Sequence, residues 1–131
     1  FQELVEDEIL ITADTIVVIE GEILGKPKSK EDAISMLEKL SRKPHQVYTA
    51  ITIRSLNEKV TKTDVATVYF EDLKLSEIEY YVNNFQVLDK AGSYGVQDWL
   101  GMAKISKIEG SFYTIMGFPT HLVYQMLQKF N

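Results

Sequence analysis

Two stretches of alternating sequence, HQVYTAITI (His45–Ile53) and VATVYF (Val65–Phe70), decide the fold class. In both, apolar or β-branched side chains recur at every second position, which is typical of strands with one buried face. The polar segment Ser55–Glu58 lies between them, so we predict that they form an antiparallel hairpin. Such a hairpin argues against a purely parallel, doubly wound sheet.

Toward the N-terminus, ITADTIVVIEGEILGKP (Ile11–Pro27) predicts a second and shorter hairpin. Its apolar strands, Ile16–Ile19 and Ile23–Leu24, are joined by a short turn. Asp14 stands just before the first strand and Lys26 just after the second. Because a tight hairpin brings its two ends together, we expect Asp14 and Lys26 to line one cleft.

Capping patterns predict helices on both sides of the central hairpin. Ser29, answered by Asp32, is expected to start a helix that ends before Pro44. Ser76, answered by Glu79, is expected to start another. The spacing of apolar residues after each cap gives both helices one buried face.

The C-terminal part predicts a strand at Ala103–Ile108 and a last helix after Pro119. Strands and helices thus alternate along the whole chain. We predict an α/β fold, a mixed sheet with flanking helices, in a single domain spanning residues 1–131.

Composition excludes several classes of protein. No apolar run approaches the roughly 18 residues that would span a bilayer, so no membrane interaction is expected. The net charge of −5 disfavours binding to nucleic acid but leaves room for a small anionic ligand in a locally positive pocket. The absence of cysteine rules out disulfides and zinc–thiolate sites, and we expect a cytoplasmic protein.

The sequence leaves two interpretations of Asp14 open. It is either a cap or turn residue at a strand end, or a carboxylate that binds a divalent cation or takes a proton from water. Lys26 alone is weaker evidence, since a lysine after glycine is usually solvated. The pairing strengthens both, because an acid beside a base can hold metal and phosphate together.

A second candidate site is the glycine-bearing segment DKAGSYGVQDW (Asp89–Trp99). Its glycines would let a ligand approach backbone N–H groups, and Gln97 offers both a donor and an acceptor. We expect Lys90 and Gln97 to bind substrate there. The alternative is a plain turn-rich loop, and neither the Walker nor the dinucleotide spacing is present.

In order and spacing, the motifs ADTIVVIEGEILGKP, HQVYTAITI, DKAGSYGVQ and IEGSFYTIMGFP resemble the Maf family. These proteins are septum-formation-inhibitor-like nucleotide pyrophosphatases, and their fold is related to that of the inosine-triphosphate pyrophosphatases. The resemblance extends from about Leu10 to the C-terminus.

The resemblance implies an enzyme that hydrolyses nucleoside triphosphates to monophosphate and pyrophosphate with a divalent cation, Mg²⁺ or Mn²⁺. This activity would clear non-standard nucleotides from the pool. Asp14 matches the family's catalytic base or metal-linked acid, Thr15 its neighbour, and Lys26 the phosphate-facing lysine. The tyrosine, glycine and glutamine of the segment YGVQ (Tyr94–Gln97) resemble the subgroup that prefers dTTP and UTP over methylated GTP. The resemblance also implies that Gln97 lines one cleft with Asp14 and Lys26.

Two departures from the family pattern qualify this expectation. The family's Ser-x-Ser-Pro-Arg-Arg loop and a later glutamate are not in the printed sequence, which opens at Phe1 without a methionine. We therefore expect an N-terminally incomplete domain, weak or inactive when these 131 residues are expressed alone. The family also has glycine where this chain has Asp98, a carboxylate that would repel triphosphate or shift base preference.

A non-catalytic nucleotide-binding or regulatory protein on the same fold is the alternative function, since a fold does not determine an activity. The physiological nucleotide, the metal and the oligomeric state stay open at this point, with a homodimer among the alternatives.

Overall fold

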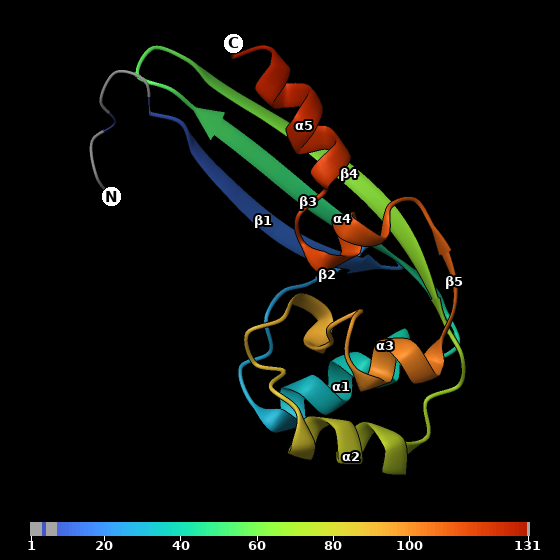
Figure 1. Ribbon diagram of the computed structural model, residues 1–131. Helices are drawn as coiled ribbons and strands as arrows, with labels where there is room; N and C mark the ends of the chain where they lie inside the picture. Colours follow the sequence, from blue (N-terminus) through green and yellow to red (C-terminus); the bar gives the residue numbers. More distant parts are fainter. Residues whose placement is uncertain (1–3, 5–7, 131) are drawn as a thin grey trace.

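One antiparallel sheet organises the structure, a computed structural model that describes residue 4 and residues 8–130 (Figure 1). Its strand order is β2-β1-β3-β4-β5, and all four neighbouring pairs are antiparallel. The predicted α/β class with flanking helices and the predicted central hairpin are both confirmed, but the sheet of the described residues is antiparallel throughout and not mixed. The strands are β1 (Leu10–Ile19), β2 (Glu22–Leu24), β3 (Pro44–Arg54), β4 (Lys59–Phe70) and β5 (Ile105–Glu109).

Short helices cover this sheet. Within the described part of the chain, none of them has the length and hydropathy needed to cross a membrane. They are α1 (Lys30–Leu40), α2 (Leu75–Asn84), α3 (Trp99–Lys104), α4 (Phe112–Met116) and α5 (Thr120–Gln128), with one 3₁₀ turn, η1 (Ala91–Ser93).

The first predicted helix cap is confirmed and the second is wrong. The backbone N–H of Asp32 donates to the Ser29 hydroxyl at 3.1 Å, as an N-cap requires. Helix α2 begins one residue before Ser76. Lys74 is its N-cap, and the backbone N–H of Lys74 donates to the Glu77 carboxylate at 2.9 Å. The carboxylate that completes the box therefore belongs to Glu77.

Asp14 lies inside strand β1, not before it. The strand begins at Leu10, and Asp14 pairs with Ala50 of β3. An unbroken ladder with β3 runs from Leu10 to Val18. This pairing outweighs the low strand preference of an aspartate, which depends strongly on context.

The C-terminal third differs most from the prediction. The segment Trp99–Lys104 is helical, so β5 begins at Ile105 and not at Ala103. Helix α4 was not predicted at all. The expected last helix is confirmed as α5, with Pro119 at its N-cap.

Both groups of helices pack on the same face of the sheet. Alternate residues of β3, from His45 to Ile53, are buried on that face. One apolar cluster joins it to α1, α2 and α3, and a separate cluster joins Ile51 and Ile53 to α5. Figure 1 shows α1–α3 gathered at one end of the sheet and α4 and α5 along the other. The two groups thus leave part of the covered face open between them.

Candidate active site

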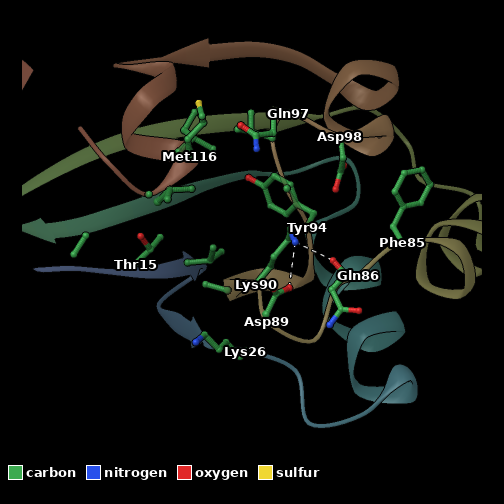
Figure 2. A pocket seen from close by; sticks show the side chains of 18 of the residues that line it. Thr15, Lys26, Phe85, Gln86, Asp89, Lys90, Tyr94, Gln97, Asp98 and Met116 are labelled. Atoms are coloured by element: carbon green, nitrogen blue, oxygen red, sulfur yellow. Dashed lines mark hydrogen bonds and ion pairs between the residues drawn. The ribbon is translucent and has the colours of Figure 1, made fainter. Parts of the chain in front are cut away.

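A cleft of about 540 Å³ lies where the two helix groups separate. Its walls come from β1, the turn after β2, the loop after α2 and the end of α4 (Figure 2). This cleft is lined by the three residues that were expected to share one, Asp14, Lys26 and Gln97, and also by Thr15 and Lys90. The role assigned to each of these residues stays a prediction.

Glycine brings two loops of the cleft together. The backbone N–H of Gly92 donates to the carbonyl of Gly25 at 3.1 Å, which ties the glycine-bearing loop to the turn that carries Lys26. Gly92 has a φ of +69°, and a Cβ there would lie 2.9 Å from Val17 Cγ2. A side chain at this position would therefore be strained and would push the glycine-bearing loop away from strand β1.

Lys90 is bonded to an aspartate inside the cleft. The Lys90 ammonium donates to the Gln86 carbonyl at 2.9 Å and to the Asp89 carboxylate at 3.1 Å (Figure 2). Lys90, and more weakly Lys26, hold the pKa of the Asp89 carboxyl below its usual range. Asp89 is therefore ionised at neutral pH. The sequence placed Asp89 at the start of the glycine-bearing segment but indicated no role for it.

Thr15 and Asp14 belong to opposite faces of β1. The Thr15 hydroxyl lies 2.9 Å from the hydroxyl of Thr49, a buried residue on the helix-covered face. Successive side chains of a strand alternate between faces, so the exposed Asp14 side chain belongs to the other one. Strand β2 pairs only with Val17–Ile19, which leaves Asp14 on a part of β1 that has no outer partner among the described residues. Asp14 is a lining residue of the cleft, although its side chain belongs to the face of β1 that the helices do not cover.

Asp98 has a structural task that its place in the sequence did not reveal. One carboxylate oxygen accepts from the backbone N–H of Leu100 at 3.2 Å and caps helix α3. The other accepts from the Tyr81 hydroxyl at 2.5 Å. Both carboxylate oxygens are thus held by protein donors, and the effect of the Asp98 charge on a triphosphate stays a prediction. An N-cap just before Trp99 was the signal that sequence reasoning missed.

A buried histidine, His45, contacts a residue that lines the cleft. The side chain of His45 is fully buried, and its Nε2 lies 2.6 Å from the hydroxyl of Tyr94, which lines the cleft. The His45 ring also stacks on Phe70, with centroids 5.4 Å apart. Burial lowers the pKa of His45 to about 4 and raises the pKa of Tyr94 above its usual range. Both side chains are therefore neutral at pH 7.

Acid should destabilise the protein through His45. Its pKa in the folded state lies below the ordinary value of 6.5, so the unfolded chain takes up the proton first as pH falls. The contribution of neutral His45 is complete above about pH 6.5 and is lost as pH falls toward 4, at a cost on the order of 3 kcal/mol. Urea unfolding at pH 7 and pH 4 measures this difference.

His45→Gln, which does not titrate, should lose less free energy of unfolding between these two pH values than the parent. The partly exposed His121 provides the control, and His121→Gln should retain the parental fall. Equal falls in the parent and in His45→Gln would contradict this account.

Comparison with known proteins agrees with the motifs. The sequence profile of the family described as "Maf-like protein" matches residues 1–130. A protein of Christiangramia forsetii named dTTP/UTP pyrophosphatase is 46% identical over 127 residues, which cover 97% of this chain and 65% of that relative. A protein of the same name from Bacteroides thetaiotaomicron is 47% identical over 122 residues, covering 93% of this chain and 63% of the relative.

A third protein of that name, from Flavobacterium psychrophilum, is 42% identical over 125 residues, which cover 95% of this chain and 64% of the relative. The chain thus spans 63–65% of the length of these curated relatives.

Proposed function

This chain belongs to the Maf-like protein family, and we propose that its cleft hydrolyses nucleoside triphosphates, dTTP and UTP in particular, to monophosphate and pyrophosphate. The observation that carries the proposal is the meeting of Lys26 and Lys90, from two separate loops, with Thr15 and Gln97 in one cavity. The names of the relatives supply the nucleotides.

The cleft suits a nucleotide in size and charge. Its volume of about 540 Å³ lies within the range of small-molecule sites. Two lysines at one end can bind the phosphates, although the chain as a whole is acidic. The Gln97 amide offers a donor and an acceptor, which match the neighbouring N3–H and carbonyl oxygens of uracil or thymine.

The proposed reaction is an attack of water on the α-phosphorus. The water oxygen forms a bond to this phosphorus, the bond to the bridging oxygen breaks, and pyrophosphate leaves. Asp14 takes the proton from water as general base. Lys26 and Lys90 stabilise the negative charge that develops on the phosphates, which requires Lys90 to turn from Asp89 toward the substrate.

A divalent cation, Mg²⁺ or Mn²⁺, is part of the proposal. Among the described residues, no group of three or more His, Asp or Glu side chains could hold a metal ion alone. The donor set fits a cation shared with the substrate, because magnesium sites often use one or two carboxylates together with phosphate oxygens. Asp14 and Asp89 would be those carboxylates, because both are exposed residues of the cleft lining. Both oxygens of Asp98 already accept hydrogen bonds from the protein. Such a cation, when bound, neutralises phosphate charge.

Pyrophosphate release by the full-length protein tests the function. With Mg²⁺ or Mn²⁺ present, dTTP and UTP should be turned over at least about tenfold more efficiently than CTP, ATP or GTP. Lys26→Ala should lower kcat/KM about 10- to 100-fold, the usual effect of losing one bond to a charged group. Lys28→Ala, two residues along and outside the cleft lining, is the matched control.

Binding of dTTP without pyrophosphate release would favour the alternative, a non-catalytic nucleotide-binding protein. A cytoplasmic location, a homodimer and the lack of nucleic-acid binding stay predictions from sequence and resemblance. The first two need localisation and sedimentation measurements on the full-length protein.

A further inference from the structure

We propose that Tyr81 is a positioning residue for the cleft, whose hydroxyl locks the loop that carries Gln97 in its working position. The inference rests on the proposed function only where its test measures enzyme kinetics. Tyr81 lies on α2 and does not line the cleft itself, so it would act through the residues that it holds.

The Tyr81 hydroxyl joins two points of the loop at once. It donates to the Asp98 carboxylate at 2.5 Å and accepts from the backbone N–H of Gly95 at 3.1 Å. Gln97 lies between these two points and points into the cleft from the same loop (Figure 2). A third bond, from the backbone N–H of Asp98 to the carbonyl of Gly95 at 3.2 Å, closes the turn around Gln97.

The direction of these bonds is fixed by chemistry. An ionised carboxylate only accepts and a backbone N–H only donates, so the single hydroxyl proton must point to Asp98. Burial, and then the bond to Asp98, raise the pKa of Tyr81 above its usual range. The hydroxyl therefore stays protonated at neutral pH.

Close packing at Gly95 restricts the position of this loop. A Cβ on Gly95 would lie 2.9 Å from the Asp98 carboxylate and 3.0 Å from Lys90 Cε. The bare Cα of Gly95 thus lets the carboxylate and the lysine stem lie against the loop. The Tyr81 ring is independently seated, stacked on Phe85 with centroids 5.1 Å apart. Removing the hydroxyl should therefore free the loop without unseating the ring.

The loop has a second anchor on the other side. Tyr94, three residues before Gln97, is bonded to the buried His45 of β3. The sheet thus fixes the start of the segment, and α2 fixes its end. Loss of the α2 anchor alone should loosen Gln97, while the segment around Tyr94 keeps its place.

Tyr81→Phe in the full-length protein tests the proposal. KM for dTTP should rise about 5- to 20-fold while kcat changes less than about threefold, the pattern of lost binding rather than lost chemistry. Hydrogen exchange of the Gly95 amide, followed by NMR, should speed up at least about tenfold. Tyr80→Phe is the matched control, because Tyr80 is the exposed neighbour on the same helix and should change neither quantity.

A double-mutant cycle separates the lock from general loss of stability. Serine is as good an N-cap as aspartate, so Asp98→Ser should keep α3 while removing the acceptor of the Tyr81 hydroxyl. If the lock acts as a unit, Tyr81→Phe combined with Asp98→Ser should raise KM no further than the larger single effect.

An unchanged KM and an unchanged Gly95 exchange rate in Tyr81→Phe would overturn the proposal. So would effects that multiply in the double variant, or a rise in KM of equal size in Tyr80→Phe. A parent protein that releases no pyrophosphate would defeat the proposed function but not this one, since the exchange rate of Gly95 still decides whether Tyr81 holds the loop.

Discussion

Asp14→Asn in the full-length protein is expected to lower the rate of pyrophosphate release from dTTP by about 10²–10⁴-fold. Asparagine has the size of aspartate but takes no proton from water and is a poorer ligand for a hard cation. Asp14 is an exposed position of β1, and aspartate and asparagine are both poor strand formers, so the melting temperature should stay within a few degrees of the parent. Binding of dTTP should change far less than turnover, because Lys26 and Lys90 remain.

The structural interpretation of Asp14 makes the opposite prediction. If the residue only occupies its place in β1, the asparagine variant should turn over dTTP at the parental rate, whether or not its melting temperature falls. Glu38→Gln, an exposed charge removal on α1 outside the cleft lining, controls for net charge and should leave turnover unchanged. Parental turnover by Asp14→Asn would remove this residue from the mechanism.

Gly101→Ala is expected to lower the free energy of unfolding by more than about 3 kcal/mol. A Cβ on Gly101 would lie 2.0 Å from the carbonyl oxygen of Val96, which is backbone and has no rotamer to escape into. Helix α3 would have to move away from the loop that carries Gln97. Urea unfolding measures the stability, and the KM for dTTP should rise as well.

The sign of this effect makes the test sharp. In an unconstrained helix interior, glycine to alanine stabilises by about 1 kcal/mol, because alanine is the better helix former. Met102→Ala, at an exposed position of the same helix, is the control and should change stability by less than about 1 kcal/mol. A gain in stability from Gly101→Ala would contradict the close approach of α3 to the loop.

The sequence was a good guide to the parts of the fold that local chemistry sets. Alternation in β3 and β4 and the cap at Ser29 each follow from one segment's own pattern, and the structure has all of them. Helix α3 could not be predicted in this way. It has 6 residues, too few to show the helical spacing of apolar side chains. It also contains Gly101, which is needed because the backbone of Val96 lies too close for a side chain.

The sequence indicated which residues lie near the cleft but not which way their side chains point. The hairpin spacing and the family resemblance predicted Asp14, Lys26 and Gln97 around one cleft, and all three line it. The face of β1 to which Asp14 belongs depends on its register with β3, which the sequence alone does not set. The hydrogen bond between Tyr81 and Asp98 joins residues 17 positions apart, so it could not be predicted from the local sequence around either residue.

Hydrolysis of dTTP in water enriched in oxygen-18 tests the central claim most directly. We propose that the full-length protein activates water for attack on the α-phosphorus, with Asp14 as base. Mass spectrometry of the products should then find one labelled oxygen in the nucleoside monophosphate and none in the pyrophosphate. Label in the pyrophosphate would place the attack on the β-phosphorus, and formation of nucleoside diphosphate with labelled inorganic phosphate would place it on the γ-phosphorus. Either result would contradict the account.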